Sequence, residues 1–455
     1  MDRRQAHTGR ESWPWTKIPP LRIGVWLEAM SPGLWTAAHE LSESLRMLRA
    51  RRFGTFWVAS LLSNIGTWAQ QVAEPWLLLT VGASPFLVGL DSFAQNAPVL
   101  VLTIVGGVLA DRLDRRRVIA LFQSIQMLCP VIIVALLLGH AVRPLVVVAL
   151  SLVVGITDAL SMPSFQSIVP SIVPREQIAR GLALNSTQFN LSRILGPAIA
   201  GVLMASVGAV ACFALNAVSY VPFIGIALWI LPARSVATAP RELDRSPIAD
   251  LRDILGSPFL RGALLTVLTT SFFCAPLVTF TPVLVKEALE GGSNQYSAAV
   301  AAFGVGGLLG AIGLLAVPPG ADRRRWSSRA AVGYGLAVLM AAVLPSCRPL
   351  PAVMVVAGTS MAITNISANS LLQAAAERRL LGRSVSLYML AMRGGMSLGA
   401  LLTGLAAHQL GVRAALLIDG VAAVAIHLVI GRLWLPRARA DHPHGVKKAT
   451  HIRGK

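Results

Sequence analysis

Four acidic side chains interrupt the long apolar runs of this sequence: Glu74, Asp91, Asp158 and Asp419. An ionisable group is costly inside a membrane, and such residues usually carry protons or bind charged ligands. Glu74 and Asp91 lie toward the same membrane face in successive runs, so their carboxyls could share or pass a proton. We predict that this pair couples activity to protons. The alternative is that Glu74 reaches headgroup water and that Asp419 makes a structural hydrogen bond.

A compact charged stretch, "GGVLADRLDRRRVIA" at residues 106–120, places two aspartates and four arginines within seven residues. Asp111 is positioned to cap a helix N-terminus, where the helix dipole favours an anion. The arginines could bridge to a neighbouring helix, and we expect Asp158 to pair with Arg112 or Arg115. The alternative is that the arginines only anchor this loop at the inner membrane face.

Two arginines, Arg193 and Arg393, lie inside apolar runs and each needs an anionic or carbonyl partner there. They could face a cavity and attract an anionic substrate. Alternatively, each could hold two helix bundles together through a fixed ion pair. The sequence leaves both possibilities open.

Motifs for catalysis, nucleotides or metals are missing from the sequence. No G-x-x-x-x-G-K-[ST] occurs, which argues against ATP-driven pumping. His408 and His427 are isolated, and the four cysteines form no C-x-x-C pair. We therefore expect no cofactor, no metal and no enzyme activity.

The elements that carry these residues are predicted to be membrane helices. The chain has 455 residues, 55% hydrophobic and only 13% charged, and its mean hydropathy is +0.65. A span needs about 20 apolar residues, and barrel strands alternate over about 10, so long continuous runs indicate helices. We predict an all-α membrane protein with twelve transmembrane helices in two six-helix bundles, near residues 55–80, 85–109, 118–138, 144–165, 181–205, 209–231, 259–284, 297–317, 329–346, 350–372, 384–407 and 412–435.

The distribution of basic residues predicts the orientation. The net charge of +19 could indicate nucleic-acid binding. However, the loops predicted to face outward hold only four basic residues, namely Arg143, Lys286, Arg348 and Arg413. Because cytoplasmic loops carry the excess of Lys and Arg, we place both termini in the cytoplasm and expect contact with anionic headgroups, not nucleic acid.

The domain boundaries follow from these runs. We predict a cytoplasmic extension at 1–52, a helical bundle at 53–231, a linker at 232–257, a second bundle at 258–435 and a basic tail at 436–455. A true start near Met47 is an alternative, which would leave 1–46 untranslated. The two bundles show a weak internal repeat, because "DRRR" at residues 114–117 recurs at 322–325.

The stretch "GGVLADRLDRRRV" resembles the signature loop between helices 2 and 3 of the major facilitator superfamily. Five residues fall on the positions of that motif: Gly107, Asp111, Arg112, Arg115 and Arg116. Asp114 replaces a second glycine of the motif, so the turn there could differ.

A second stretch, "ILGPAIAG", is similar to the antiporter motif of the same superfamily, with matches at Gly196, Pro197 and Gly201. Ala200 replaces one glycine of that motif. The surrounding sequence resembles the subfamily that includes bacterial siderophore exporters. Proline removes a backbone hydrogen bond, so we expect a bend at Gly196 and Pro197.

This resemblance implies alternating access between two rocking bundles, with the signature loop latching the cytoplasmic side onto helix 11. It also implies a cavity lined by spans 1, 4, 7 and 10, whose polar residues include Asn64, Gln70, Gln71, Thr364, Asn365 and Asn369. The implied function is proton-coupled efflux of a siderophore-like or drug-like molecule by a monomer in the bacterial inner membrane. An importer or facilitator, or a non-transporting membrane sensor or scaffold, are the alternatives.

Overall fold

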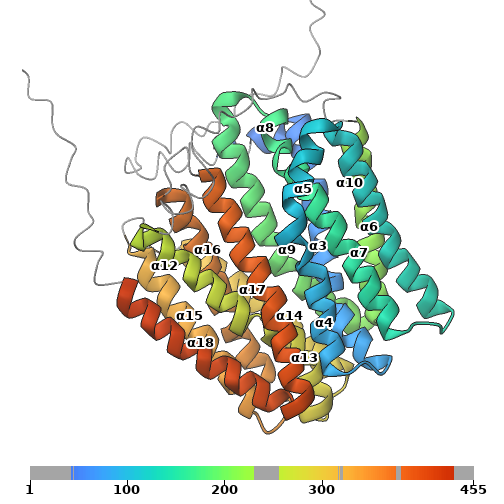
Figure 1. The fold of residues 1–455 in the computed structure, drawn as a ribbon, viewed down its shortest axis with the longest axis vertical. Coiled ribbons are helices and arrows are strands. Elements are labelled where there is room, and N and C mark those ends of the chain that lie inside the picture. The colour runs from blue at the N-terminus through green and yellow to red at the C-terminus, as the bar shows by residue number, and fades with distance from the viewer. Residues whose placement is uncertain are drawn as a thin grey trace, which may run out of the picture.

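The computed structural model describes residues 42–44, 46–229, 256–315, 317, 321–375 and 381–434, and these residues form helices without any β-strand (Figure 1). The predicted extension, linker and tail therefore lie largely outside the described residues. The first group of helices, which we call the N-group, comprises α3 (Arg51–Thr80), α4 (Pro85–Asn96), α5 (Pro98–Arg112), α6 (Arg115–Leu138), α7 (Pro144–Gln166), α8 (Ile168–Ile172), α9 (Ile178–Ser206) and α10 (Ala209–Trp229).

The second group, the C-group, contains one span that is divided into four pieces. These are α12 (Pro258–Thr269), η2 (Thr270–Cys274), α13 (Pro276–Val283) and η3 (Leu284–Ala288), of which the two η segments are π-helical. The other helices of the C-group are α14 (Ser293–Leu315), α15 (Arg323–Val343), α16 (Leu350–Ala375), α17 (Leu381–Leu410) and α18 (Val412–Trp434).

Eleven helical segments of the described chain are long and apolar enough to cross a membrane. This confirms the prediction of an all-α membrane protein. The helix α3, at the first predicted span, has 30 residues but is not among the eleven. Its two initial arginines, Glu74 and several amides lower its mean hydropathy, so the count of twelve spans stays a prediction that depends on α3.

The helix ends define two faces of the molecule. We call the end with residues 112–117 and 322–325 the Arg-rich end, and the end with loops 81–84, 139–143 and 344–349 the Arg-poor end. At the Arg-rich end, Asp114 caps α6 by accepting a hydrogen bond from the backbone N–H of Arg116 at 3.0 Å. Asp322 caps α15 in the same way, from Arg324 at 3.1 Å. The repeated "DRRR" is thus the same capping device in both groups.

The two groups lie side by side and meet along two long helix pairs, α4 with α17 and α9 with α14 (Figure 1). Glycines allow this close approach. A Cβ atom on Gly89 would lie 2.5 Å from the carbonyl oxygen of Ala400, and one on Gly201 would lie 2.6 Å from that of Ser297. Gly201 of the antiporter-like motif therefore contacts the C-group directly.

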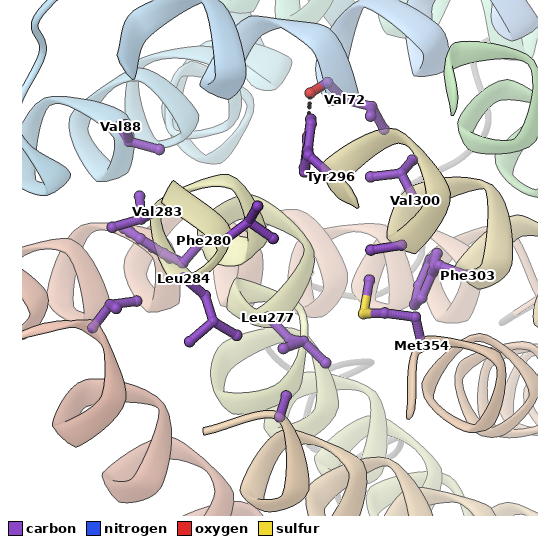
Figure 2. Packing of buried hydrophobic residues seen from close by; sticks show 14 of the residues in the cluster. Val72, Val88, Leu277, Phe280, Val283, Leu284, Tyr296, Val300, Phe303 and Met354 are labelled. Atoms are coloured by element: carbon purple, nitrogen blue, oxygen red, sulfur yellow. Dashed lines mark hydrogen bonds between the residues drawn. The ribbon is translucent and has the colours of Figure 1, made fainter. Parts of the chain in front are cut away.

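A cluster of contacts closes the junction toward the Arg-poor end (Figure 2). The Tyr296 hydroxyl of α14 donates to the carbonyl oxygen of Val72 on α3 at 2.6 Å, and its ring stacks on Trp76 at 5.0 Å between centroids. The Lys286 ammonium donates to the carbonyl oxygen of Leu79, also at 2.6 Å. We call these five residues the Arg-poor clamp.

The divided span contacts the N-group mainly through its half near the Arg-poor end. The helix α13 packs on α3 and α4, whereas α12 packs chiefly on α16, α17 and α18 of its own group. The two groups therefore meet most closely toward the Arg-poor end.

Candidate functional site

A cavity of about 90 Å³ lies at the junction of the two groups. Its N-group wall includes Trp68, Gln71, Val72, Glu74, Pro75, Asp91, Ser92, Gln95, Asn96, Arg193 and Pro197; its C-group wall includes Ala275, Val278, Thr279, Phe303, Tyr334, Met361 and Met396. A drug-sized ligand usually occupies about 300–1,000 Å³, and one water takes about 30 Å³. The structure therefore shows a contracted site that would have to widen around a ligand.

Glu74 is held in the cavity wall by donors from its own group. The Ser151 hydroxyl donates to its Oε1, and the Gln70 amide donates to its Oε2 at 3.4 Å. Gln70 in turn accepts from the Asn216 amide at 2.7 Å. Glu74 is only 2% exposed, so the alternative that it reaches headgroup water is wrong. Gln70 belongs to this network and does not line the cavity as expected.

Asp91 enters the same cavity from α4 and is 5% exposed. Its Oδ1 has no hydrogen-bond partner among the described residues. Beside it, the Gln71 amide donates to Gln95 at 2.9 Å, and both amides line the cavity. The structure thus brings Glu74 and Asp91 to one compartment, while their role in proton coupling stays a prediction.

Arg193 lines the cavity without a carboxylate partner among the described residues. Its guanidinium lies 3.5 Å from the sulfur of Met392, 3.9 Å from that of Met361 and 5.2 Å from the ring centroid of Trp68. The possible fixed ion pair is therefore not made by Arg193.

Arg393 does make an ion pair between the groups. Its guanidinium lies 3.2 Å from Oδ2 of Asp158, so Asp158 is joined to the C-group by a residue that was not among its expected partners, while its expected pairing with Arg112 or Arg115 stays a prediction. Arg393 also donates to Oδ1, the side-chain amide oxygen of Asn96, at 3.0 Å. These three residues bridge the groups on the side of the cavity nearer the Arg-rich end.

The remaining residues of the signature loop occupy the end of α5 and the start of α6. The side chains of Asp111 and Arg112 lie outside the described part of the structure, so the capping role of Asp111 stays a prediction. Arg116 forms an ion pair with Asp114 at 3.3 Å. A Cβ atom on Gly107 would meet no atom within 4 Å.

Other predicted residues are divided between the cavity and its surroundings. Gly196 packs closely against Trp68, and Pro197 lines the cavity within an uninterrupted α9. Asn64 is half-buried on α3. Asn365 is buried on α16, and its side-chain Oδ1 has no hydrogen-bond partner among the described residues. Neither residue lines the cavity. They are therefore not placed at the site in this conformation.

Several cavity residues were not predicted from the sequence. The thioethers and rings of Met361, Met396, Phe303 and Tyr334 look like ordinary membrane-helix residues in the sequence. Asn96 gave one signal, because it is an amide in an apolar run, two residues before Pro98. In the described ranges, no group of His, Cys, Asp and Glu side chains is arranged to hold a metal ion.

Residues 42–450 match the family model described as transmembrane secretion effector. The chain belongs to this family. The match confirms the resemblance to the major facilitator superfamily that the two sequence motifs carried. As a member of this family, the chain is a membrane-embedded secondary transporter of small molecules that works by alternating access in a bacterial inner membrane.

Curated relatives of the chain include efflux and siderophore transporters. It is 26% identical to the multidrug efflux pump Tap of Mycolicibacterium fortuitum, over 84% of this chain and 95% of that protein. It is 27% identical to the enterobactin exporter EntS of Salmonella choleraesuis, over 77% and 84%. The match to the staphyloferrin A transporter of Staphylococcus aureus, 26% identical, spans 56% of this chain and 64% of that relative.

Solved structures of similar fold include the nucleoside transporter NupG, with a TM-score of 0.63 at 12% identity over 85% of this chain and 99% of that one. The D-xylose-proton symporter gives a TM-score of 0.63 at 14% identity over 83% and 96%. At these identities the likeness shows the fold alone, which is the predicted one.

Proposed function

We propose that this transporter exports a small siderophore-like or drug-like molecule in exchange for protons, with Glu74 and Asp91 as the proton carriers. The relatives named as efflux pump and enterobactin exporter support the direction of transport. The observation that carries the proton coupling is that both buried carboxyls line one cavity at the junction of the two groups. Protonation at this junction can therefore change how strongly the groups attract each other or a ligand.

The cavity lies between two sets of contacts that cannot both persist during alternating access. The Arg-poor clamp joins α3 to the C-group on one side, and the bridge of Arg393 to Asp158 and Asn96 joins the groups on the other. We propose that opening toward one membrane face breaks the set on that face while the other set holds. In this proposal the Arg-rich end and both termini face the cytoplasm, and the transporter acts as a monomer without cofactor or metal.

The test is transport into inverted membrane vesicles with an acidic lumen, using a panel of siderophores and drugs. We expect at least one compound to accumulate, and its accumulation to stop when the pH gradient is collapsed. Asp91→Asn should remove this dependence on the gradient. Asp419→Asn is the matched control, because Asp419 is buried on α18 and accepts from Thr403 at 2.6 Å, away from the cavity.

Two results would contradict the proposal. Movement of the compound out of the vesicles would indicate an importer. An Asp91→Asn variant with the same gradient dependence as the parent protein would exclude Asp91 as a proton carrier.

A further inference from the structure

The side chains that line the cavity include one cation and two acids. Arg193 comes from α9, Glu74 from α3 and Asp91 from α4. The other titratable side chains around them are Cys129 on α6 and the tyrosines Tyr334 on α15 and Tyr388 on α17. Thiols and phenols are neutral near pH 7, so these three do not alter the charge of the compartment.

Among the described residues, Arg393 is the other charged side chain that acts on Arg193. Asp158 and Arg393 form their own ion pair beside the cavity, as described above. Arg193 faces sulfur atoms and aromatic rings, which solvate a guanidinium poorly compared with a carboxylate. The charge of Arg193 must therefore be balanced within the cavity, by Glu74, by Asp91 or by a ligand.

A compartment of this size between two protein surfaces holds few waters, so a net charge in it is expensive. With Arg193 charged, the empty cavity is neutral when one carboxyl is ionised and the other keeps its proton. Two ionised carboxylates would leave one negative charge, and two protonated carboxyls would leave one positive charge. The empty site thus retains one proton between Glu74 and Asp91.

We infer that the transported molecule is an organic cation, which enters this cavity in exchange for the single proton shared by Glu74 and Asp91. When a monovalent cation binds, that proton leaves, and two carboxylates then balance Arg193 and the ligand. An anion would instead require a second proton to be taken up, so that anion and proton would move together. This inference rests on the proposed proton-driven export, because only exchange of ligand and proton lets an inward proton gradient drive a ligand outward.

The uncharged part of the wall suits such a ligand. Phe303 and Tyr334 offer aromatic rings besides that of Trp68, which already faces Arg193; such rings attract cations by about 0.5–1 kcal/mol at exposed sites and about 2 kcal/mol when desolvated. Met361 and Met396 are flexible and polarisable, and can adapt to an apolar body. The expected ligand therefore combines a positive charge with an apolar, ring-sized body.

The test measures protons released on binding, with purified full-length protein in detergent and no gradient. Three probes share one ring system: (2-naphthylmethyl)trimethylammonium as the cation, 2-naphthalenemethanol as the neutral analogue and 2-naphthalenesulfonate as the anion. In weakly buffered solution with a pH indicator, we expect about one proton released per bound cation. The cation affinity should then rise about tenfold per pH unit. The neutral probe should release none.

Charge-removal variants test the balance itself. Asp91→Asn leaves Arg193 and an ionised Glu74, a neutral site without a proton, so cation binding should fall about tenfold or more and release should disappear. Adding Arg193→Met to Asp91→Asn makes Glu74 keep a proton again, so both cation binding and the release of one proton should return. Asp419→Asn, outside the cavity, should match the parent protein.

Each contrary outcome overturns the inference. Proton uptake with the anion as the preferred probe would assign the opposite charge to the ligand, and failure of all three probes to bind would exclude the ligand class. If the double variant binds the cation as weakly as Asp91→Asn does, charge balance does not govern the site. If its cation binding recovers, a chain that carries Asp91→Asn folds. The binding assay tests the charge of the ligand, and the vesicle assay tests proton-driven export. Gradient-driven export of an anion in vesicles would therefore refute this inference and leave the proposed export intact.

Discussion

The buried carboxyl of Glu74 depends on donors that come from another helix. The Ser151 hydroxyl reaches it from α7, and removing one donor to a buried polar acceptor costs about 1–3 kcal/mol. We expect Ser151→Ala to lower the free energy of unfolding by that amount, measured by denaturation in detergent at neutral pH. Ser124→Ala is the control, because the Ser124 hydroxyl bonds only a carbonyl oxygen of its own helix. Equal effects of the two substitutions would show that Glu74 does not need Ser151.

At the residue scale, the sequence predicted that Glu74, Asp91 and Arg193 lie within membrane spans and that the two acids lie toward the same membrane face, because charged groups are conspicuous in apolar runs. It could not predict their partners. Ser151 lies 77 positions from Glu74, so helix packing alone brings them together. The ion pair of Asp158 with Arg393 was not predicted for the same reason, because Arg393 lies 235 positions away in the other group of helices.

At the element scale, the positions of the helices were predictable to within a few residues, because lipid requires continuous apolar helices with internally bonded backbones. The interruptions were not predicted. In the second span the helical hydrogen-bond pattern is interrupted at Ala97, which keeps α-helical backbone angles before Pro98, and the seventh span contains two π-helical segments. Proline removes a backbone donor, but whether a helix then bends, breaks or widens depends on its neighbours, as the unbroken α9 around Pro197 shows.

The cap of α15 carries a prediction about acid stability. Partial burial alone would raise the pKa of the Asp322 carboxyl, but hydrogen bonds from Arg324 and the charges of Arg324 and Arg325 hold that pKa below its usual value. A lowered folded-state pKa means that the carboxylate stabilises the fold above the unfolded pKa of about 3.9, and that this stabilisation is lost as the pH falls through the folded-state value.

We therefore expect Asp322→Ala to lower the free energy of unfolding by about 0.5–2 kcal/mol near neutral pH, with the difference shrinking below about pH 4. Asp322→Asn keeps an oxygen that can cap the helix, so it should be less damaging and show less of this pH dependence. Unfolding in detergent across the acid range measures both variants. A difference between the parent protein and Asp322→Ala that does not vary with pH would exclude the charge as the cause.

At the scale of the whole molecule, two features of the junction set the conformational equilibrium. Glycine contacts along α4 with α17 and α9 with α14 let the groups approach, and the Arg-poor clamp fixes them on one side. Opening at the Arg-poor end must break the bonds of Tyr296 to Val72 and of Lys286 to Leu79. The strength of the clamp therefore determines how often this end opens.

Tyr296→Phe keeps the ring that stacks on Trp76 and removes only the hydroxyl bond to Val72. A net hydrogen bond contributes about 0.5–1.5 kcal/mol, so the population open at the Arg-poor end should rise about 2- to 12-fold. A cysteine at Val88, buried on α4 near this junction (Figure 2), reports opening through its rate of labelling by a membrane-impermeant thiol reagent. The half-buried Cys347 is first replaced by serine.

Tyr220→Phe is the matched control for this measurement. Tyr220 is also buried, with 3% of its surface exposed, and it lies on α10 within the N-group, so the loss of its hydroxyl should not change opening. Faster labelling in Tyr296→Phe alone would show that a bond between the groups limits the opening of this end. Equal labelling of the parent protein and Tyr296→Phe would mean that the hydroxyl bond to Val72 does not limit opening. The ring stack on Trp76, Lys286 and the glycine contacts, which both proteins keep, would then hold this end closed.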